Sequence, residues 1–488
     1  WRTERQELEA KLKDISYKLE KATLSAKEYE EKYSKQAVEI NKIRVMEKES
    51  RMMVKKISKL EQDCSYWEKK HYDAHHELAQ LKAKTEAMDA KFAELDSLRK
   101  GDEILRNNLL EQIAEFKTKF ACEVKDFVVK DHLDRREAQR MDPFTQYAMV
   151  SSMEAIKDAN LYENDSINHD RIGVIWGAGI GGINIFQEQI AEFATGTGTP
   201  RFNPFFIPKM IADIAPGHIS IKNGFMGPNY TTVSACASSA NAMIDALNYI
   251  RLGYCDVIVT GGSEAAIAYA GVGGFNAMHA LSTRNESPET ASRPFDAERD
   301  GFVLGEGAGA IILEDYEHAK ARGAKIYAEV IGGGMSSDAY HMTAPHPEGL
   351  GVIAVMKNCL ENSGIKPEDV DHINTHGTST PLGDVAELKA ISEVFGDHAK
   401  NININSTKSM TGHLLGAAGA IESIAAILAM KHSIVPPTIN HANIDENINP
   451  ELNLTLNKAQ KREVKIAMSN TFGFGGHNAC VAFKKLEE

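Results

Sequence analysis

Cysteines, long apolar runs and basic stripes are scarce in this 488-residue chain. Its six cysteines, scattered from Cys64 to Cys480, are too dispersed for a disulfide framework, which favours a reducing compartment. No apolar run reaches the roughly 18 residues that a membrane span needs, and the charged N-terminal stretch is unlike a secretory signal. The formal net charge of -13 argues against a nucleic-acid binder. We therefore expect a soluble, cytoplasmic protein that binds neither nucleic acid nor membrane.

Proline and glycine are also missing from a long first part of the chain. Residues 1–142 contain no proline, and Gly101 is their first glycine. After Pro143 the chain becomes rich in glycine, alanine and β-branched residues. The length allows two or three domains. The change of character near residue 116 predicts two unlike parts.

The first part, residues 1–115, repeats apolar residues in alternating steps of four and three. These positions include Leu8, Leu12, Ile15, Leu19, Ala22, Ala26, Tyr29 and Tyr33, and then Cys64, Trp67, His71, Ala74, Leu78 and Leu81. Such heptads, with a slip around residues 43–53, predict a long α-helical coiled coil. As one helix it would be roughly 150 Å long and would need an unidentified partner helix to cover its seam. A single charged helix without a partner is the alternative.

The second part alternates short apolar runs with helical stretches. Strands are predicted at residues 172–176, 257–260, 310–313, 326–331, 372–374, 402–405, 464–468 and 479–483. Helices are predicted between them, for example at residues 237–251 and 417–430. This pattern indicates an α/β fold with largely parallel strands. We expect two halves, residues 116–315 and 316–488.

Cys236 lies in the segment SACASSA, residues 234–240, between a β-like run and a predicted helix. The partial positive charge of a helix N-terminus favours a thiolate. The small neighbours allow a carbonyl to approach, and a backbone N–H beside the sulfur can join an oxyanion hole. Cys236 is therefore a candidate nucleophile. The alternative is a buried, inert cysteine.

Two histidines follow in turns of small residues. His376 lies in NTHGTST, residues 374–380, and His413 lies in KSMTGHLLG, residues 408–416. Through Nε2 they can donate hydrogen bonds to a carbonyl that becomes an enolate, and Lys408 adds positive potential. Structural histidines are the alternative. No ligands stand at zinc spacing in the sequence, so we expect no metal.

Two glycine loops complete the set of motifs. Residues 177–182 match G-x-G-x-x-G after a strand, but no acidic residue ends a second strand at the expected distance, so close backbone packing is favoured over dinucleotide binding. Residues 473–478, GFGGHN, precede the last predicted strand. Phe474 between glycines can gate a pocket. A plain turn with a packed aromatic ring is the alternative.

Taken together, these motifs resemble the β-ketoacyl-acyl-carrier-protein synthases, specifically the elongating type II enzymes of bacterial fatty-acid synthesis. Supporting segments stand at residues 292–296, 300–307, 335–341 and 436–440. The resemblance covers residues 116–485. Two histidines, rather than His with Asn or with a second Cys, separate the chain from initiating synthases and thiolases.

The resemblance implies a thiolase-like, layered αβαβα fold over residues 116–488 and a homodimer. It also implies that Cys236 accepts an acyl chain as a thioester from acyl carrier protein. His376 and His413 then promote decarboxylation of malonyl-carrier protein, and the enolate attacks the thioester to give 3-oxoacyl-carrier protein. No metal or redox cofactor is implied, because the phosphopantetheine arm arrives on the carrier protein.

The same resemblance assigns further roles. It implies an oxyanion hole at the N–H groups of Cys236 and Phe474, a charged pair of Lys408 with Glu387, an inner carboxylate at Glu422, acyl-pocket and gate residues at Ile180 and Phe474, and carrier-protein contact at Arg201. For Arg201, a merely solvated arginine is the alternative.

The chain departs from the family before Phe116. There a core strand of the form V-V-V-T-G-x-G is expected and the heptads stand instead, so we expect a missing central strand, an exposed sheet edge and a first part foreign to the enzyme. His477 also stands where relatives commonly have threonine. Two other functions stay open: a coiled-coil scaffold with an inactive synthase-like domain, and a polyketide-type synthase.

Overall fold

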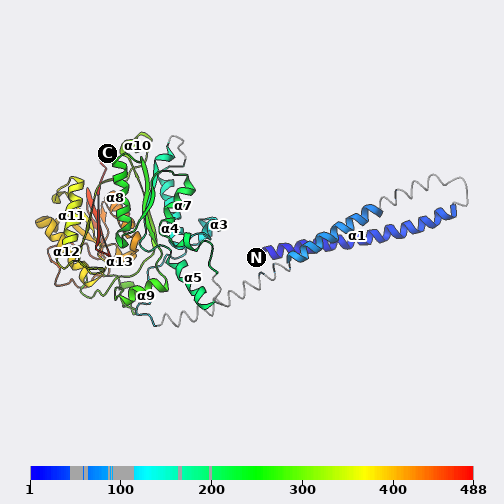
Figure 1. Cartoon of the computed structure of the whole chain (residues 1–488), viewed down its shortest axis with the longest axis horizontal. Helices are drawn as coiled ribbons and strands as arrows, with labels where there is room; N and C mark the ends of the chain where they lie inside the picture. The colour runs from blue at the N-terminus through cyan, green and yellow to red at the C-terminus, as the bar shows by residue number, and fades with distance from the viewer. Residues whose placement is uncertain are drawn as a thin grey trace. The chain divides into compact units, whose positions relative to one another are not determined.

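The structure, a computed structural model, describes residues 2–43, 59, 64–85, 88, 91, 115–162, 167–196 and 201–486. It divides into two compact units, Trp1–Glu115 and Phe116–Glu488, and each is described by itself (Figure 1).

The first unit pairs two helical segments of the same chain. Helix α1 (Arg2–Ile43) lies beside the helical residues 64–85 (Figure 1). Tyr29 stacks on Trp67 with ring centroids 6.5 Å apart, while the earlier residue Lys18 lies near the later Glu77. A later residue of the second segment thus meets an earlier residue of α1, so the two segments run antiparallel.

The predicted seam is the covered face of this pair. Leu8, Ala22 and Leu78 are buried, and the other seam residues within 5–35 and 64–85 are half-buried. The expectation of one straight helix that needs a separate partner is therefore wrong for the described residues, because the second segment covers the seam of α1. The predicted slip around residues 43–53 lies almost wholly outside the described residues.

The second unit contains two main sheets. Their strands are β1 (Ile172–Gly177), β2 (Asn229–Thr232), β3 (Val257–Glu264), β4 (Gly307–Glu314), β5 (Glu329–Ser337), β6 (His372–Asn374), β7 (Asn403–Asn405), β10 (Ile466–Gly473) and β11 (His477–Lys484), with β8 (Ile434–Val435) and β9 (Gln460–Lys461) forming a small separate sheet. The first sheet has the order β2-β1-β3-β4 and the second β5-β11-β10-β6-β7. The predicted boundary after residue 315 falls between the last strand of the first sheet and the first strand of the second.

The two sheets repeat one pattern. In each, three parallel strands are followed by an antiparallel one, β4 in the first sheet and β11 in the second. The expected parallel character is therefore only part of the arrangement. Strand β5 pairs with β11, but within the described residues no strand pairs with the corresponding side of β4. The position that lacks a strand is thus at a sheet edge, and the expectation of a missing central strand is wrong in this respect.

The helices cover both sheets in layers. They are α3 (Arg135–Ala138), α4 (Pro143–Asp158), α5 (Ile183–Thr195), α6 (Phe206–Met210), α7 (Ile214–Asn223), α8 (Ser238–Arg251), α9 (Tyr269–Ala277), α10 (Tyr316–Ala321), α11 (Leu350–Ser363), α12 (Pro381–Phe395), α13 (Lys408–Thr411) and α14 (Ala418–His432). Helices α8 and α14 contact both sheets, α4 and α7 pack on the first, and α11 packs on the second and against α12 (Figure 1). The expected layered α/β fold is confirmed.

Helix α14 and the turn before it form a long, largely apolar stretch. Leu415–His432 is long and apolar enough to cross a membrane by length and composition, although Glu422 and Lys431 interrupt its apolar run. It is 61% buried inside the protein, and it lies between the two sheets. Its apolar character is therefore that of a core helix.

His372 on β6 makes the stability of this unit sensitive to acid. It is fully buried beside Asn405 on β7, with Nε2 2.6 Å from Oδ1, and burial lowers its pKa to about 4. In the unfolded chain His372 takes up a proton as the pH falls below about 6.5, whereas in the folded chain it does so only near pH 4. The free energy of unfolding therefore decreases as the pH drops through this window. The loss at pH 5 amounts to about 2 kcal/mol.

Urea unfolding of the wild type and His372→Gln at pH 7.5 and pH 5.0 measures this effect. The variant should lose less stability on acidification, by about 2 kcal/mol, because glutamine does not titrate. His398, which is half-buried and donates to a backbone carbonyl, provides the matched control His398→Gln. Equal acid sensitivity of the wild type and His372→Gln would contradict the assignment.

Candidate active site

Cys236 stands in a tight turn between β2 and α8. The 3-10 helix Ala235–Ala237 joins them, and Ala235 adopts a left-handed φ of 51°. Ser238 stabilises the turn, since its Oγ donates to the carbonyl of Ala235 at 2.7 Å and accepts from the N–H of Ser234 at 3.0 Å. The serines and alanines of this segment thus hold the sulfur at the start of α8.

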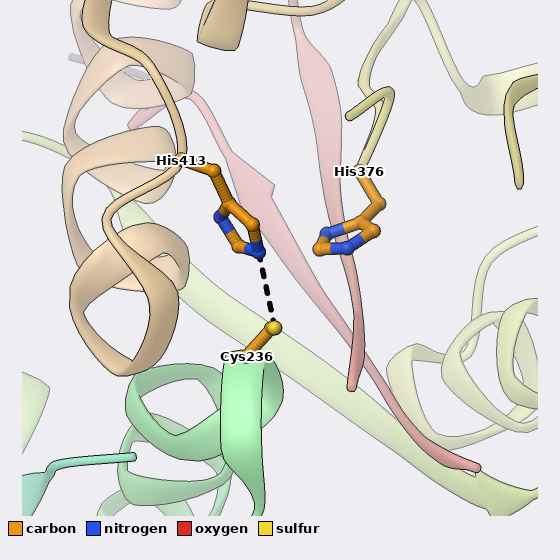
Figure 2. A group of neighbouring side chains, drawn as sticks. All are labelled: Cys236, His376 and His413. Atoms are coloured by element: carbon orange, nitrogen blue, oxygen red, sulfur yellow. Dashed lines mark hydrogen bonds between the residues drawn. The ribbon is translucent and has the colours of Figure 1, made fainter. Parts of the chain in front are cut away.

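The fold brings both predicted histidines to this sulfur. His376 follows β6 and His413 follows α13, and both are buried. His413 Nε2 lies 3.0 Å from Cys236 Sγ across 177 residues of sequence (Figure 2). The two imidazole rings are nearly perpendicular, with centroids 5.2 Å apart. Three side chains predicted separately therefore form one cluster.

Burial controls the protonation of this cluster. It raises the pKa of Cys236 to about 12, against the opposing effects of Lys408 and of the backbone N–H groups of Phe474 and Cys236. Burial, and then the charge of Lys408, holds the pKa of His376 and His413 well below the usual value. Burial thus opposes the thiolate that the start of a helix favours, and the imidazole of His413 is placed to accept the thiol proton.

The charged pair beside the histidines differs from the expected one. Lys408 Nζ donates to Glu422 Oε1, and both side chains are fully buried. Glu387 instead accepts the N–H groups of His376 and Gly377, each at 2.9 Å, and so fixes the turn that carries His376. The predicted pairing of Lys408 with Glu387 is therefore wrong, and Glu422 is the partner.

A cavity of about 570 Å³ opens beside the cluster. Cys236, His376, His413, Ile180 and Phe474 all contribute to its wall. The Phe474 ring lies 6.5 Å from that of Phe275, and the backbone of the GFGG loop passes so close to the nucleophile turn that a Cβ at Gly473 would lie 2.6 Å from the carbonyl oxygen of Ser234. Arg201 is exposed and does not line the cavity.

The G-x-G-x-x-G segment packs against the protein itself. A Cβ at Gly177 would lie 2.3 Å from the backbone nitrogen of Ser239 at the start of α8. The first glycine of the motif thus allows β1 to approach α8 closely, as the packing interpretation predicted.

Glu264, at the end of β3, was not recognised in the sequence. Its buried carboxylate accepts four backbone N–H groups, from Gly179 at 2.8 Å, Ile180 at 3.1 Å, Gly181 at 3.2 Å and Gly416 at 3.0 Å. It thereby ties the loop that carries Ile180 to the segment three residues after His413. The available signal was one acidic residue at the end of an otherwise uncharged strand.

Comparison with known proteins shows similarity to β-ketoacyl synthases. A family model for the β-ketoacyl synthase N-terminal domain matches residues 72–319, and one for the C-terminal domain matches residues 327–442. The 3-oxoacyl-[acyl-carrier-protein] synthase 2 of Staphylococcus aureus strain N315 is 50% identical over 367 residues, which are 75% of this chain and 87% of that protein.

Two solved structures are similar as well. A β-ketoacyl synthase from Burkholderia phymatum STM815 has a TM-score of 0.72 at 34% identity and covers 76% of this chain and 90% of its own. The second is a type II polyketide synthase acyl-carrier protein in complex with its ketosynthase bound to the hexaketide. The matched chain has a TM-score of 0.69 at 33% identity, and the match covers 76% of this chain and 89% of that one.

Proposed function

The chain belongs to the β-ketoacyl synthase family, and from this premise we propose that it elongates acyl chains by decarboxylative condensation of malonyl-carrier protein with an acyl thioester on Cys236. The observation that carries the proposal is the Cys236–His376–His413 cluster beside a cavity. The 50% identity to a 3-oxoacyl-[acyl-carrier-protein] synthase 2, against 33% to a polyketide ketosynthase, favours fatty-acid elongation over a polyketide-type reaction.

Acyl transfer begins at the hydrogen bond between Cys236 and His413. His413 accepts the thiol proton while the sulfur attacks the acyl thioester, so the high pKa of the buried thiol is no obstacle. The acyl C–S bond to the carrier protein then breaks, and the phosphopantetheine thiolate that leaves takes the proton from His413. The backbone N–H groups of Cys236 and Phe474 both lower the pKa of the Cys236 thiol, and we infer that they lie beside the carbonyl of an acyl group bound to this sulfur. They are suited to stabilise the oxyanion of the tetrahedral intermediate.

Condensation then uses both histidines on the second substrate. As malonyl-carrier protein loses carbon dioxide, its thioester carbonyl becomes an enolate, which His376 and His413 stabilise by hydrogen bonds. Lys408 contributes positive potential, since its charge acts on both rings. The enolate carbon attacks the acyl carbonyl, the Cys236 sulfur leaves, and 3-oxoacyl-carrier protein is formed. No metal or redox cofactor is needed.

The carrier protein and a second copy of the chain are the proposed partners. The phosphopantetheine arm would bring substrate to the cavity past Ile180 and Phe474, and exposed Arg201 is suited to contact an acidic carrier protein. A homodimer is supported by exposed apolar side chains on α5, on α6 and in the segments beside α6. They are Phe186, Ile190, Phe193, Phe202, Phe205, Ile207 and Ile211.

For residues 1–115 we propose a helical unit that is separate from the condensing unit and foreign to it. The support is the heptad seam and the division of the structure after Glu115. The family model for the N-terminal synthase domain matches from residue 72, and it therefore favours assigning residues 72–115 to the condensing enzyme. A cytoplasmic location is proposed from the scattered cysteines and the acidic composition.

Intact-mass analysis of the purified chain tests the function. Incubation with acyl-carrier protein should add one acyl group to the chain. Addition of malonyl-carrier protein should remove that group while a 3-oxoacyl-carrier protein two carbons longer is formed. A folded protein that gains no acyl group would contradict the proposal and favour an inactive domain on a helical scaffold.

Glu264 offers a second test, on the shape of the acyl pocket. In Glu264→Gln an amide NH₂ group replaces one carboxylate oxygen. The amide nitrogen cannot accept hydrogen bonds from the backbone N–H groups that face it, so the loop carrying Ile180 loses its anchor. We expect kcat/KM for acyl transfer to fall by about tenfold, mainly through KM, and the preference among acyl lengths to shift.

The matched control is Glu306→Gln. Glu306 also accepts hydrogen bonds, from the N–H of Val124 and the hydroxyl of Tyr147, but it lines a different hollow. Acyl-length preference should be unchanged in this variant. Equal effects of the two substitutions would show that Glu264 acts only on general stability.

A further inference from the structure

The cluster that performs the proposed chemistry also has the composition of a metal site. Cys236, His376 and His413 each present one ligand atom, and these atoms all lie within 4.8 Å of one another (Figure 2). The linear spacing of the sequence indicated no zinc ligands, but the fold assembles a thiol and two imidazoles from three separate loops. We propose that these three side chains bind a zinc ion that reversibly inhibits the enzyme.

The geometry is close to that of a zinc site with three protein ligands. Zn–S bonds of about 2.3 Å and Zn–N bonds of about 2.0 Å at tetrahedral angles place the ligand atoms roughly 3.3–3.6 Å apart. Sγ of Cys236 lies 3.0 Å from Nε2 of His413, and the perpendicular rings approach from different directions. Small side-chain movements therefore suffice. The fourth position faces the cavity, where water can complete the coordination.

The charges around the cluster permit a cation. Lys408, the cationic side chain whose charge acts on both histidines, opposes a cation here, and its pairing with Glu422 reduces that repulsion. The anionic groups nearby are Glu264, whose charge acts on Cys236, and Glu387, which holds the His376 turn. A thiol and imidazoles select zinc and related transition metals over magnesium or calcium, which prefer oxygen ligands.

Zinc binding exchanges one bond of the Cys236 sulfur for another and blocks acylation of this sulfur. The S–H bond of Cys236 breaks, its proton passes to solvent, and an S–Zn bond forms without any change of oxidation state. An acylated sulfur offers no thiolate, so the acyl-enzyme should not bind the ion. Zinc would therefore arrest the free enzyme, whereas acylation protects it.

The probe for this site is cobalt(II), added to the full-length protein under anaerobic conditions and then displaced by zinc. We expect one equivalent to give a thiolate-to-cobalt charge-transfer band and the visible bands of tetrahedral cobalt. The bands should be lost in Cys236→Ala, His376→Ala and His413→Ala and after acylation of Cys236. They should persist in Cys480→Ala and His372→Gln, whose native residues are buried elsewhere.

The readout also separates this site from the histidines of the first unit. His71 and His75 stand one helical turn apart and offer an imidazole pair, but no thiol, so metal bound there lacks the charge-transfer band. At ten times the dissociation constant, zinc should slow acyl transfer about tenfold, and a chelator should reverse this. A band that survives Cys236→Ala, or no band on folded protein, would overturn the proposal whether or not the protein catalyses condensation.

Discussion

Replacing Cys236 with alanine should abolish the acyl-enzyme, with roughly a 10⁴-fold or greater loss of condensation. None of the other five cysteines lines the cavity. Cys255, Cys359 and Cys480 are buried elsewhere, Cys122 lines a different hollow, and Cys64 belongs to the first unit. Intact mass after incubation with acyl-carrier protein measures the effect directly.

The same variant should keep part of the chemistry. His376 and His413 remain in place, because alanine removes only the sulfur from the turn, so decarboxylation of malonyl-carrier protein should persist without an acyl acceptor. Cys480→Ala, which removes a buried cysteine of the second sheet, should retain full acylation. An acyl adduct that survives in Cys236→Ala would refute the nucleophile assignment.

Local sequence patterns predicted most of the fold. Strands β1, β4, β6 and β11 and helix α8 begin and end within three residues of the predicted bounds, because hydrophobic periodicity reports which face of an element is buried. Predicted strands at residues 326–331 and 464–468 correspond to β5 and β10 with shifted bounds. Periodicity does not specify which strands pair, so the antiparallel β4 and β11 were missed.

The structural duplication of the two halves is not visible in the residue identities. Ala235 before α8 and Leu415 before α14 adopt nearly the same left-handed φ, 51° and 47°, in corresponding 3-10 turns. Only one of the turns carries a cysteine. The backbone geometry is thus repeated where the side chains have diverged, and a search of residue identities cannot detect it.

At the site, motifs predicted the residues but not their partners. Cys236, His376 and His413 converge as expected, since each stands in a recognisable turn. The partner of Lys408 depends on which buried carboxylate the tertiary fold brings to it, and this is Glu422 on α14 rather than Glu387 on α12. The raised pKa of Cys236 likewise results from burial, which the helix-start argument did not include.

Breaking the Lys408–Glu422 pair should have the largest effect on stability. Lys408→Met leaves Glu422 fully buried without its partner, so that this side chain is either an unpaired charge or must take up a proton, at a cost of about 3–5 kcal/mol. The measurement is the free energy of unfolding at pH 8, where Glu422 of the wild type, whose pKa burial raises to about 7 in spite of Lys408, is ionised. Glu422→Met should be comparably destabilised, because it leaves the lysine without its partner.

The double variant Lys408→Met/Glu422→Met separates stability from catalysis. With both charges removed and similar volumes kept, most of the lost stability should return, since two apolar side chains need no partner. Decarboxylation should nevertheless remain about 100-fold below the wild type, because the positive potential that acts on His376 and His413 is gone. If the double variant regained full condensation, Lys408 would serve the fold alone. If it stayed as unstable as either single variant, the two side chains would not be energetically coupled.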